Sequence, residues 1–62
     1  MANTPEFEIY KDDQGEFRWR LQDTNNKIIA DSAEAYTRKD SVERAIPNVK
    51  DAVANAVIND RT

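Results

Sequence analysis

The stretch FEIYKDDQGEFRWRL, residues 7–21, decides the fold of this chain. It contains two runs in which apolar and polar residues alternate, separated by the turn composition DDQG at residues 12–15. This pattern predicts two antiparallel strands joined by a tight loop. With Gly15 at the left-handed position of a three-residue loop, Asp12 lies opposite Glu16.

Counting back from this turn predicts the register of the hairpin. Alternate residues of a strand point to opposite faces, so a slip of one residue would bury an arginine. Four cross-strand pairs follow, two on the core face and then two on the opposite face: Ile9–Trp19, Phe7–Leu21, Tyr10–Arg18 and Glu8–Arg20.

A third strand is expected in KIIADS, residues 27–32, after the second turn signal DTNN at residues 23–26. The loop between the strands holds either two or four residues, and both lengths give the same faces. The residues expected on the core face are Ile28 and Ala30, and those expected on the opposite face are Lys27, Ile29 and Asp31.

Arg18 and Arg20 are interpreted as a charge-paired, solvated face of the sheet. Glu8 lies beside them on one neighbouring strand and Asp31 on the other. Asp31 falls opposite Arg20 if the loop holds two residues, and opposite Arg18 if it holds four. Each exposed pair of this kind stabilises by about 0.2–1 kcal/mol.

The alternative interpretation of this face is weak nucleic-acid binding. Its residues would be Tyr10, which stacks on a base, and Arg18, Arg20 and Lys27, which meet phosphates. The formal net charge of −3 and the neighbouring acidic residues argue against it, as does the single aromatic side chain.

A helix is expected to begin at DSVE, residues 40–43, with Asp40 as N-cap and Glu43 reaching back as in a capping box. Apolar residues then recur at helical spacing, which predicts one buried stripe. The stripe comprises Val42, Ala45, Ile46, Val49, Ala52 and Val53.

The second half of the helix is open to two interpretations. Pro47 predicts a kink or a brief break near Ile46, because proline costs about 3 kcal/mol inside an unbroken helix. Beyond it, the stripe can continue through Ala56 and Val57. Equally, Asn55 can end the helix and AVIN, residues 56–59, can form a short final strand.

The size of the chain predicts association. Its 62 residues make one domain. Folding would bury about 3,500 Å² of apolar surface, which contributes about 90 kcal/mol, while ordering the chain costs about the same. Small folds are otherwise stabilised by disulfides, metals or a partner, and this sequence has no cysteine or histidine.

The composition also excludes several chemistries. Catalytic triads need histidine, and glycine-rich phosphate loops need more than the one glycine present. Asp12, Asp13 and Glu16 form a carboxylate cluster, but on a hairpin tip without a pocket to shift their pKa values or the spacing of a calcium loop. We therefore expect no enzyme, no cofactor and no metal, and a cytoplasmic protein without a membrane span.

FEIYKDDQGEFRWRL, NKIIADSAEAYTRKDS and AIPNVK together resemble the YegP-like family, small bacterial and archaeal domains of unknown function. The likeness covers residues 6–54. It implies an α+β fold with a three-stranded antiparallel meander, one helix and a last strand that two units exchange; it implies no catalytic or binding residues. The chain departs from the family at Ala33 and Ala35, where glycines are usual, and at Pro47.

These inferences together predict a small homodimeric structural or protein-interaction module. Residues 1–5 are expected to be a flexible end, and residues 6–60 the domain. The exchanged strand, which adds to a sheet edge of the second copy, is expected to consist of Asn55, Ala56, Val57, Ile58 and Asn59.

Overall fold

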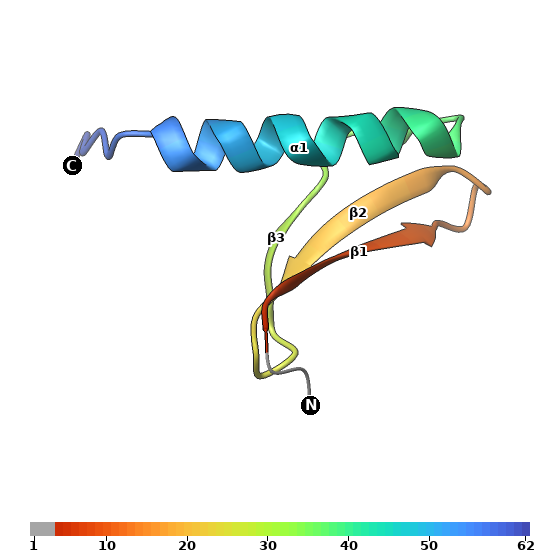
Figure 1. The fold of residues 1–62 in the computed structure, drawn as a ribbon, viewed down its shortest axis with the longest axis horizontal. Coiled ribbons are helices and arrows are strands. Elements are labelled where there is room, and N and C mark those ends of the chain that lie inside the picture. The colour runs from red at the N-terminus through yellow and green to blue at the C-terminus, as the bar shows by residue number, and fades with distance from the viewer. Residues whose placement is uncertain (1–3) are drawn as a thin grey trace.

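A computed structural model of the chain describes residues 4–62. It has three strands, β1 (Glu6–Lys11), β2 (Phe17–Gln22) and β3 (Ile28–Asp31), followed by one helix, α1 (Lys39–Asn55). The strands form an antiparallel sheet in the order β1-β2-β3, and α1 lies across one face of it (Figure 1). This confirms the predicted α+β meander with a helix. Of the end expected at residues 1–5, residues 1–3 lie outside the described residues.

The first hairpin has the predicted register at every pair, including Ile9 opposite Trp19 and Tyr10 opposite Arg18. Gly15 adopts a φ of +78°, as its place in a three-residue loop requires. The side chain of Asp12 organises the loop, since its Oδ1 accepts backbone hydrogen bonds from Gln14 at 2.9 Å and Glu16 at 3.0 Å.

The second hairpin repeats this construction with other residues. Asp23 occupies the position equivalent to Asp12, and its Oδ1 accepts hydrogen bonds from the backbone N–H groups of Asn25 and Lys27. Asn26 takes the part of Gly15 with a φ of +63°, a conformation that asparagine tolerates better than most residues. The loop therefore holds three residues, neither two nor four.

A β-bulge between Leu21 and Gln22 compensates for this odd loop length. Next to the loop, Gln22 pairs with Ile28, so the expectation that Ile28 shares the face of Leu21 is wrong. The bulge then shifts the register by one residue. As a result Leu21 faces Ala30 and Arg20 faces Asp31, which is the pairing predicted for a short loop.

The predicted capping of the helix is wrong. Arg38 is the N-cap residue and makes no side-chain cap hydrogen bond, whereas Asp40 lies inside the first turn. There the Asp40 carboxylate accepts hydrogen bonds from Arg38 at 2.8 Å and Arg44 at 2.9 Å. A carboxylate in a first turn is favourable next to the helix dipole, so this residue stabilises the helix start without capping it.

The helix runs through Pro47 without the expected break and ends at Asn55 (Figure 1). At that end, the side-chain amide of Asn55 donates to the Asp51 carbonyl at 2.8 Å, and Ala56 has an extended conformation. Residues 56–62 have no regular structure. The continued helix is thus excluded, and the last strand is not formed within a single chain.

The core is small and lies where α1 crosses β2. Trp19 is 7% exposed and Val42 is fully buried; these are the buried hydrophobic side chains of the described part. Ser32 is buried beside them, and its Oγ accepts the Trp19 N–H while its own N–H donates to the Trp19 carbonyl. The last two residues of the predicted stripe, Ala52 and Val53, are exposed.

Ala33 and Ala35, where the resemblance leads one to expect glycine, are not strained. Among the described non-glycine residues, positive φ is found at Asn26 and not at Ala33 or Ala35. The segment between β3 and α1 is instead held by Tyr36, which exchanges two backbone hydrogen bonds with Phe17. That contact places the chain for its return across the sheet, and the sequence pattern did not reveal it.

Candidate interaction surfaces

The first surface is the sheet face that carries Arg20. Its guanidinium donates to the carboxylate of Glu8 on β1 and stacks on the Tyr10 ring, with 4.4 Å between the guanidinium carbon and the ring centroid. Asp31 lies opposite it on β3. The predicted charge pairing of Arg20 is confirmed. The guanidinium of the same residue covers the ring of Tyr10.

Arg18 has a partner that the sequence reasoning missed. Its Nε donates a 2.7 Å hydrogen bond to Oδ2 of Asp12, the residue that also organises the first loop. This hydrogen bond, followed by those from the loop backbone, lowers the pKa of the Asp12 carboxyl below its ordinary value of 3.8. The expectation that nothing shifts the pKa values of the hairpin-tip carboxylates is therefore wrong for Asp12.

Of the four residues of the alternative nucleic-acid face, Tyr10, Arg18 and Arg20 lie on strands of the sheet, but Lys27 does not. It precedes β3, and its backbone carbonyl accepts the Asp23 N–H at 2.9 Å in the second loop. Arg18 and Arg20 are each engaged by a carboxylate. The four residues therefore do not form a surface of free cations.

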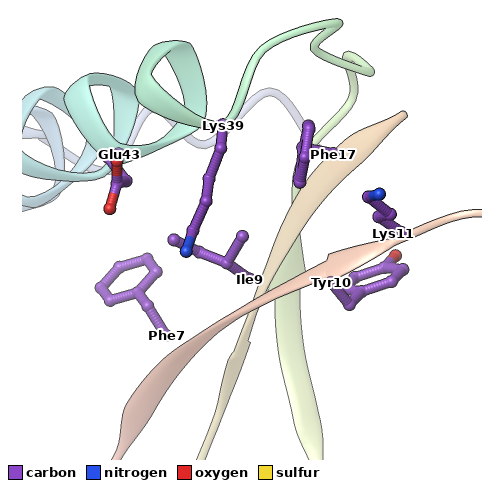
Figure 2. A pocket seen from close by; sticks show the side chains of 7 residues that line it. All are labelled: Phe7, Ile9, Tyr10, Lys11, Phe17, Lys39 and Glu43. Carbon is purple, nitrogen blue, oxygen red and sulfur yellow. The ribbon is translucent and has the colours of Figure 1, made fainter. Parts of the chain in front are cut away.

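The second surface is a groove of about 480 Å³ between β1 and the start of α1, which we call the β1 groove (Figure 2). Phe7, Ile9 and Phe17 supply its apolar side chains, and Lys39 and Glu43 descend toward it from α1. The remaining lining residues are Tyr10 and Lys11.

The β1 groove runs along an unpaired strand edge, because β1 is the first strand of the sheet. At the start of the ladder, Asp12 donates its N–H to the Glu16 carbonyl, so these two residues form a hydrogen-bonded pair. The following residue, Phe17 of β2, instead exchanges backbone hydrogen bonds with Tyr36, on the side of β2 away from β1. Hydrogen-bonded pairs alternate along an antiparallel ladder. The backbone groups of Phe7, Ile9 and Lys11 therefore point away from β2, toward the free edge.

The third surface is apolar and comprises the end of α1 with the tail, which we define as residues 56–62. Val53 is 66% exposed, Val57 86% and Ile58 98%. The end of α1 projects beyond the strands, and the tail continues in the same direction (Figure 1). Nothing else in the described chain covers these side chains.

The overall dimensions show how incomplete the packing is. The chain exposes 5106 Å², whereas area scaling for 7.1 kDa gives about 4,100 Å². Its radius of gyration is 13.1 Å, against about 10.6 Å for a compact domain of this length. The excess of roughly 1,000 Å² is comparable to the ~800 Å² that each partner contributes to a standard interface.

Among residues 4–62, histidine, cysteine and carboxylate side chains nowhere gather in a group of three that could hold a metal ion. The helix of that region is not long and apolar enough to cross a membrane.

The architecture defines a class: a small α+β domain in which a three-stranded antiparallel meander is crossed by one C-terminal helix. Residues 12–60 match the family model described as a domain of unknown function, DUF1508. The chain therefore belongs to this family, which is the YegP-like family that the sequence resembles.

Relatives and a solved structure agree with this assignment. The UPF0339 protein NMB1088 of Neisseria meningitidis serogroup B is 48% identical over 48 residues, which cover 77% of this chain and 84% of the relative. The UPF0339 protein Atu5359 of Agrobacterium fabrum is 41% identical over 56 residues, 90% and 89% of the two chains. An NMR structure of a Haloferax volcanii protein matches with a TM-score of 0.84 and 33% identity over 97% of this chain and 98% of that one.

Proposed function

We propose that this chain is a homodimeric structural or protein-interaction module without a catalytic site. In the dimer, residues 55–59 of each copy add a strand to the sheet of the other. A cytoplasmic location, which suits a chain without cysteine, belongs to the same proposal.

The observation that carries the proposal is the apolar end of the chain. Val57 and Ile58 are β-branched residues that follow Ala56, whose backbone is extended at the end of α1. Both side chains are almost fully exposed. Single exposed apolar residues are common, but here Val53 precedes them on a helix end that lies beyond the sheet. A second copy would cover this surface.

The small core supports the same proposal. Only Trp19 and Val42 are buried among the hydrophobic side chains of residues 4–62. Such a core scarcely offsets the conformational entropy of 62 residues, so a stable fold needs additional buried area. Strand exchange with two-fold symmetry would provide this additional buried area in each of the two copies.

Sedimentation of the full chain and of a version that ends at Ala54 tests the proposal. We expect the full chain to be a dimer at tens of micromolar, and the shortened chain to be monomeric and less stable. A full-length monomer at that concentration would contradict it. So would a shortened chain that remains dimeric and equally stable.

A further inference from the structure

We infer that the β1 groove is a binding site for a small organic carboxylate with an apolar body. The body lies on the side chains of Phe7, Ile9 and Phe17. The carboxylate binds the ammonium groups of Lys11 and Lys39. This inference goes beyond the proposed function, because every residue of the site belongs to one chain and no second copy is required.

The size and the floor of the β1 groove suit a small ligand. Its volume of about 480 Å³ falls within the roughly 300–1,000 Å³ typical of ligand sites, which are lined mainly by apolar and aromatic side chains. Phe7, Ile9 and Phe17 are half-buried, so each still exposes surface in the groove. A ligand with an apolar body would remove this surface from water, which favours binding.

Two lysines of the β1 groove are available to bind an anion. All four ion pairs within residues 4–62 use arginine, so none of them engages Lys11 or Lys39. Lys11 lies opposite Phe17 in the hairpin, and its ammonium is 5.3 Å from the centroid of that ring. Lys39 descends from the first turn of α1 toward Ile9 (Figure 2). One cation therefore reaches the apolar floor from the sheet and the other from the helix.

The local charge of the β1 groove is opposite in sign to that of the whole chain. The chain has a formal net charge of −3. The groove is lined by two cations, Lys11 and Lys39, and one anion, Glu43, and is therefore positive. The Lys50 ammonium, 5.8 Å from the centroid of the Phe7 ring, adds a further positive charge beside it. A positive cleft attracts anions, so an anionic ligand is favoured over a neutral or cationic one of the same shape.

Glu43 determines the orientation of the ligand. Figure 2 shows Glu43 on the side of Phe7 and Lys11 at the other end of the groove. Because like charges repel, the ligand carboxylate is directed toward Lys11 and the apolar body toward Phe7. Two residues one turn apart on α1 should therefore have opposite effects. Removal of the Lys39 charge weakens binding of the carboxylate, and removal of the Glu43 charge strengthens it.

Titration of the full chain with phenylbutyrate tests this site, followed in proton–nitrogen correlation spectra of the isotope-labelled protein. Phenylbutanol and phenylbutylamine have the same apolar body and are the uncharged and cationic controls. We expect saturable shifts at the backbone amides of Phe7, Ile9, Phe17 and Lys39. The dissociation constant of the acid should be at least about threefold lower than that of either control, as expected for partly solvated ion pairs.

Matched variants test the roles of the charged residues. Lys39→Gln should weaken binding of phenylbutyrate about threefold, Lys39→Arg should preserve it, and Glu43→Gln should strengthen it about twofold. Lys27→Gln removes the same charge from the second loop, outside the groove, and should leave the affinity unchanged. All three side chains are exposed, and the spectrum of each variant shows directly that the fold is retained.

Several results would overturn the inference. Equal affinity for phenylbutyrate and phenylbutanol would exclude a role of the carboxylate, as would unchanged affinity in both Lys39→Gln and Glu43→Gln. Shifts centred on Val53, Val57 and Ile58 would place the probe on the apolar end of the chain. Binding of a capped acidic peptide about tenfold tighter than that of phenylbutyrate would assign the groove to a protein partner. No saturable binding at millimolar probe would exclude the site. Each of these results would leave the proposed dimer standing, because sedimentation tests it separately.

Discussion

Arg18 Nε and Asp12 Oδ2 lie 2.7 Å apart, so the middle strand is tied to the loop that precedes it. The same carboxylate accepts the loop backbone N–H groups through its other oxygen. One side chain thus closes the turn and neutralises an arginine of the sheet. The hairpin of residues 7–21 is stabilised by this joint arrangement.

The Asp12–Arg18 pair predicts a dependence of stability on pH. Because the pKa of Asp12 is lowered in the fold, its stabilising contribution is present above the ordinary value of 3.8 and is lost as the pH falls through the folded pKa. Asp12→Asn keeps the acceptor oxygen for the loop but loses the charge. We expect the difference in free energy of unfolding between wild type and variant to shrink below about pH 4, measured by urea unfolding.

Asp13→Asn is the control, since it removes the same charge from the same loop and Asp13 makes no ion pair within residues 4–62. An unfolding difference for Asp12→Asn that stayed constant from pH 7 to 2 would contradict the role assigned to the pair.

The two faces of β2 should differ in their tolerance to substitution. Trp19→Ala removes the largest buried side chain and should destabilise by about 3–5 kcal/mol, enough to unfold so small a domain. Arg18→Ala should cost less than about 1 kcal/mol, because its ion pair is partly solvated. Equal losses in denaturant unfolding would show that the faces are assigned wrongly.

The matching loops predict which residues position 15 accepts. Gly15 has a φ of +78° with open space around it, so Gly15→Ala adds backbone strain alone, about 1–2 kcal/mol. Gly15→Asn should cost clearly less, since Asn26 adopts a φ of +63° in the equivalent loop. Thermal unfolding of both variants measures which of the two is more stable. An alanine variant as stable as the asparagine variant would contradict the prediction.

Association should appear in the unfolding temperature. If the dimer is the stable form, the midpoint rises with protein concentration. Ile58→Asp would place a charge in the proposed interface and should remove this rise. Thr62→Asp adds the same charge outside residues 55–59 and should change this rise much less. A midpoint independent of concentration in the wild type would count against the dimer.

The arginine face should not bind nucleic acid, because carboxylates already engage Arg18 and Arg20. We expect no binding of labelled single-stranded RNA or DNA at low salt in an anisotropy titration. Micromolar binding that weakens steeply with salt and is lost in the double variant Arg18→Ala/Arg20→Ala would reverse this conclusion.

The sequence alone determined the strands, the loop and the register of the first hairpin. Alternation over residues 7–21 and one glycine were sufficient, because strand pairing across a short loop depends on local geometry and on keeping arginines out of the core. The existence of the helix followed in the same way from its apolar spacing. These features depend on residues close together in the chain.

The tertiary structure decided what depends on distant contacts. The second loop and its bulge form one compensating unit, in which Asn26 takes a glycine-like conformation that its residue type permits but does not require. The backbone hydrogen bonds between Tyr36 and Phe17 hold the chain on β2 shortly before α1, and α1 begins at Lys39, so Asp40 lies in the first turn and not at the cap. The end of α1 is exposed because the helix projects beyond the strands of the sheet. This difference in extent between the helix and the sheet cannot be read from the residue pattern of either one alone.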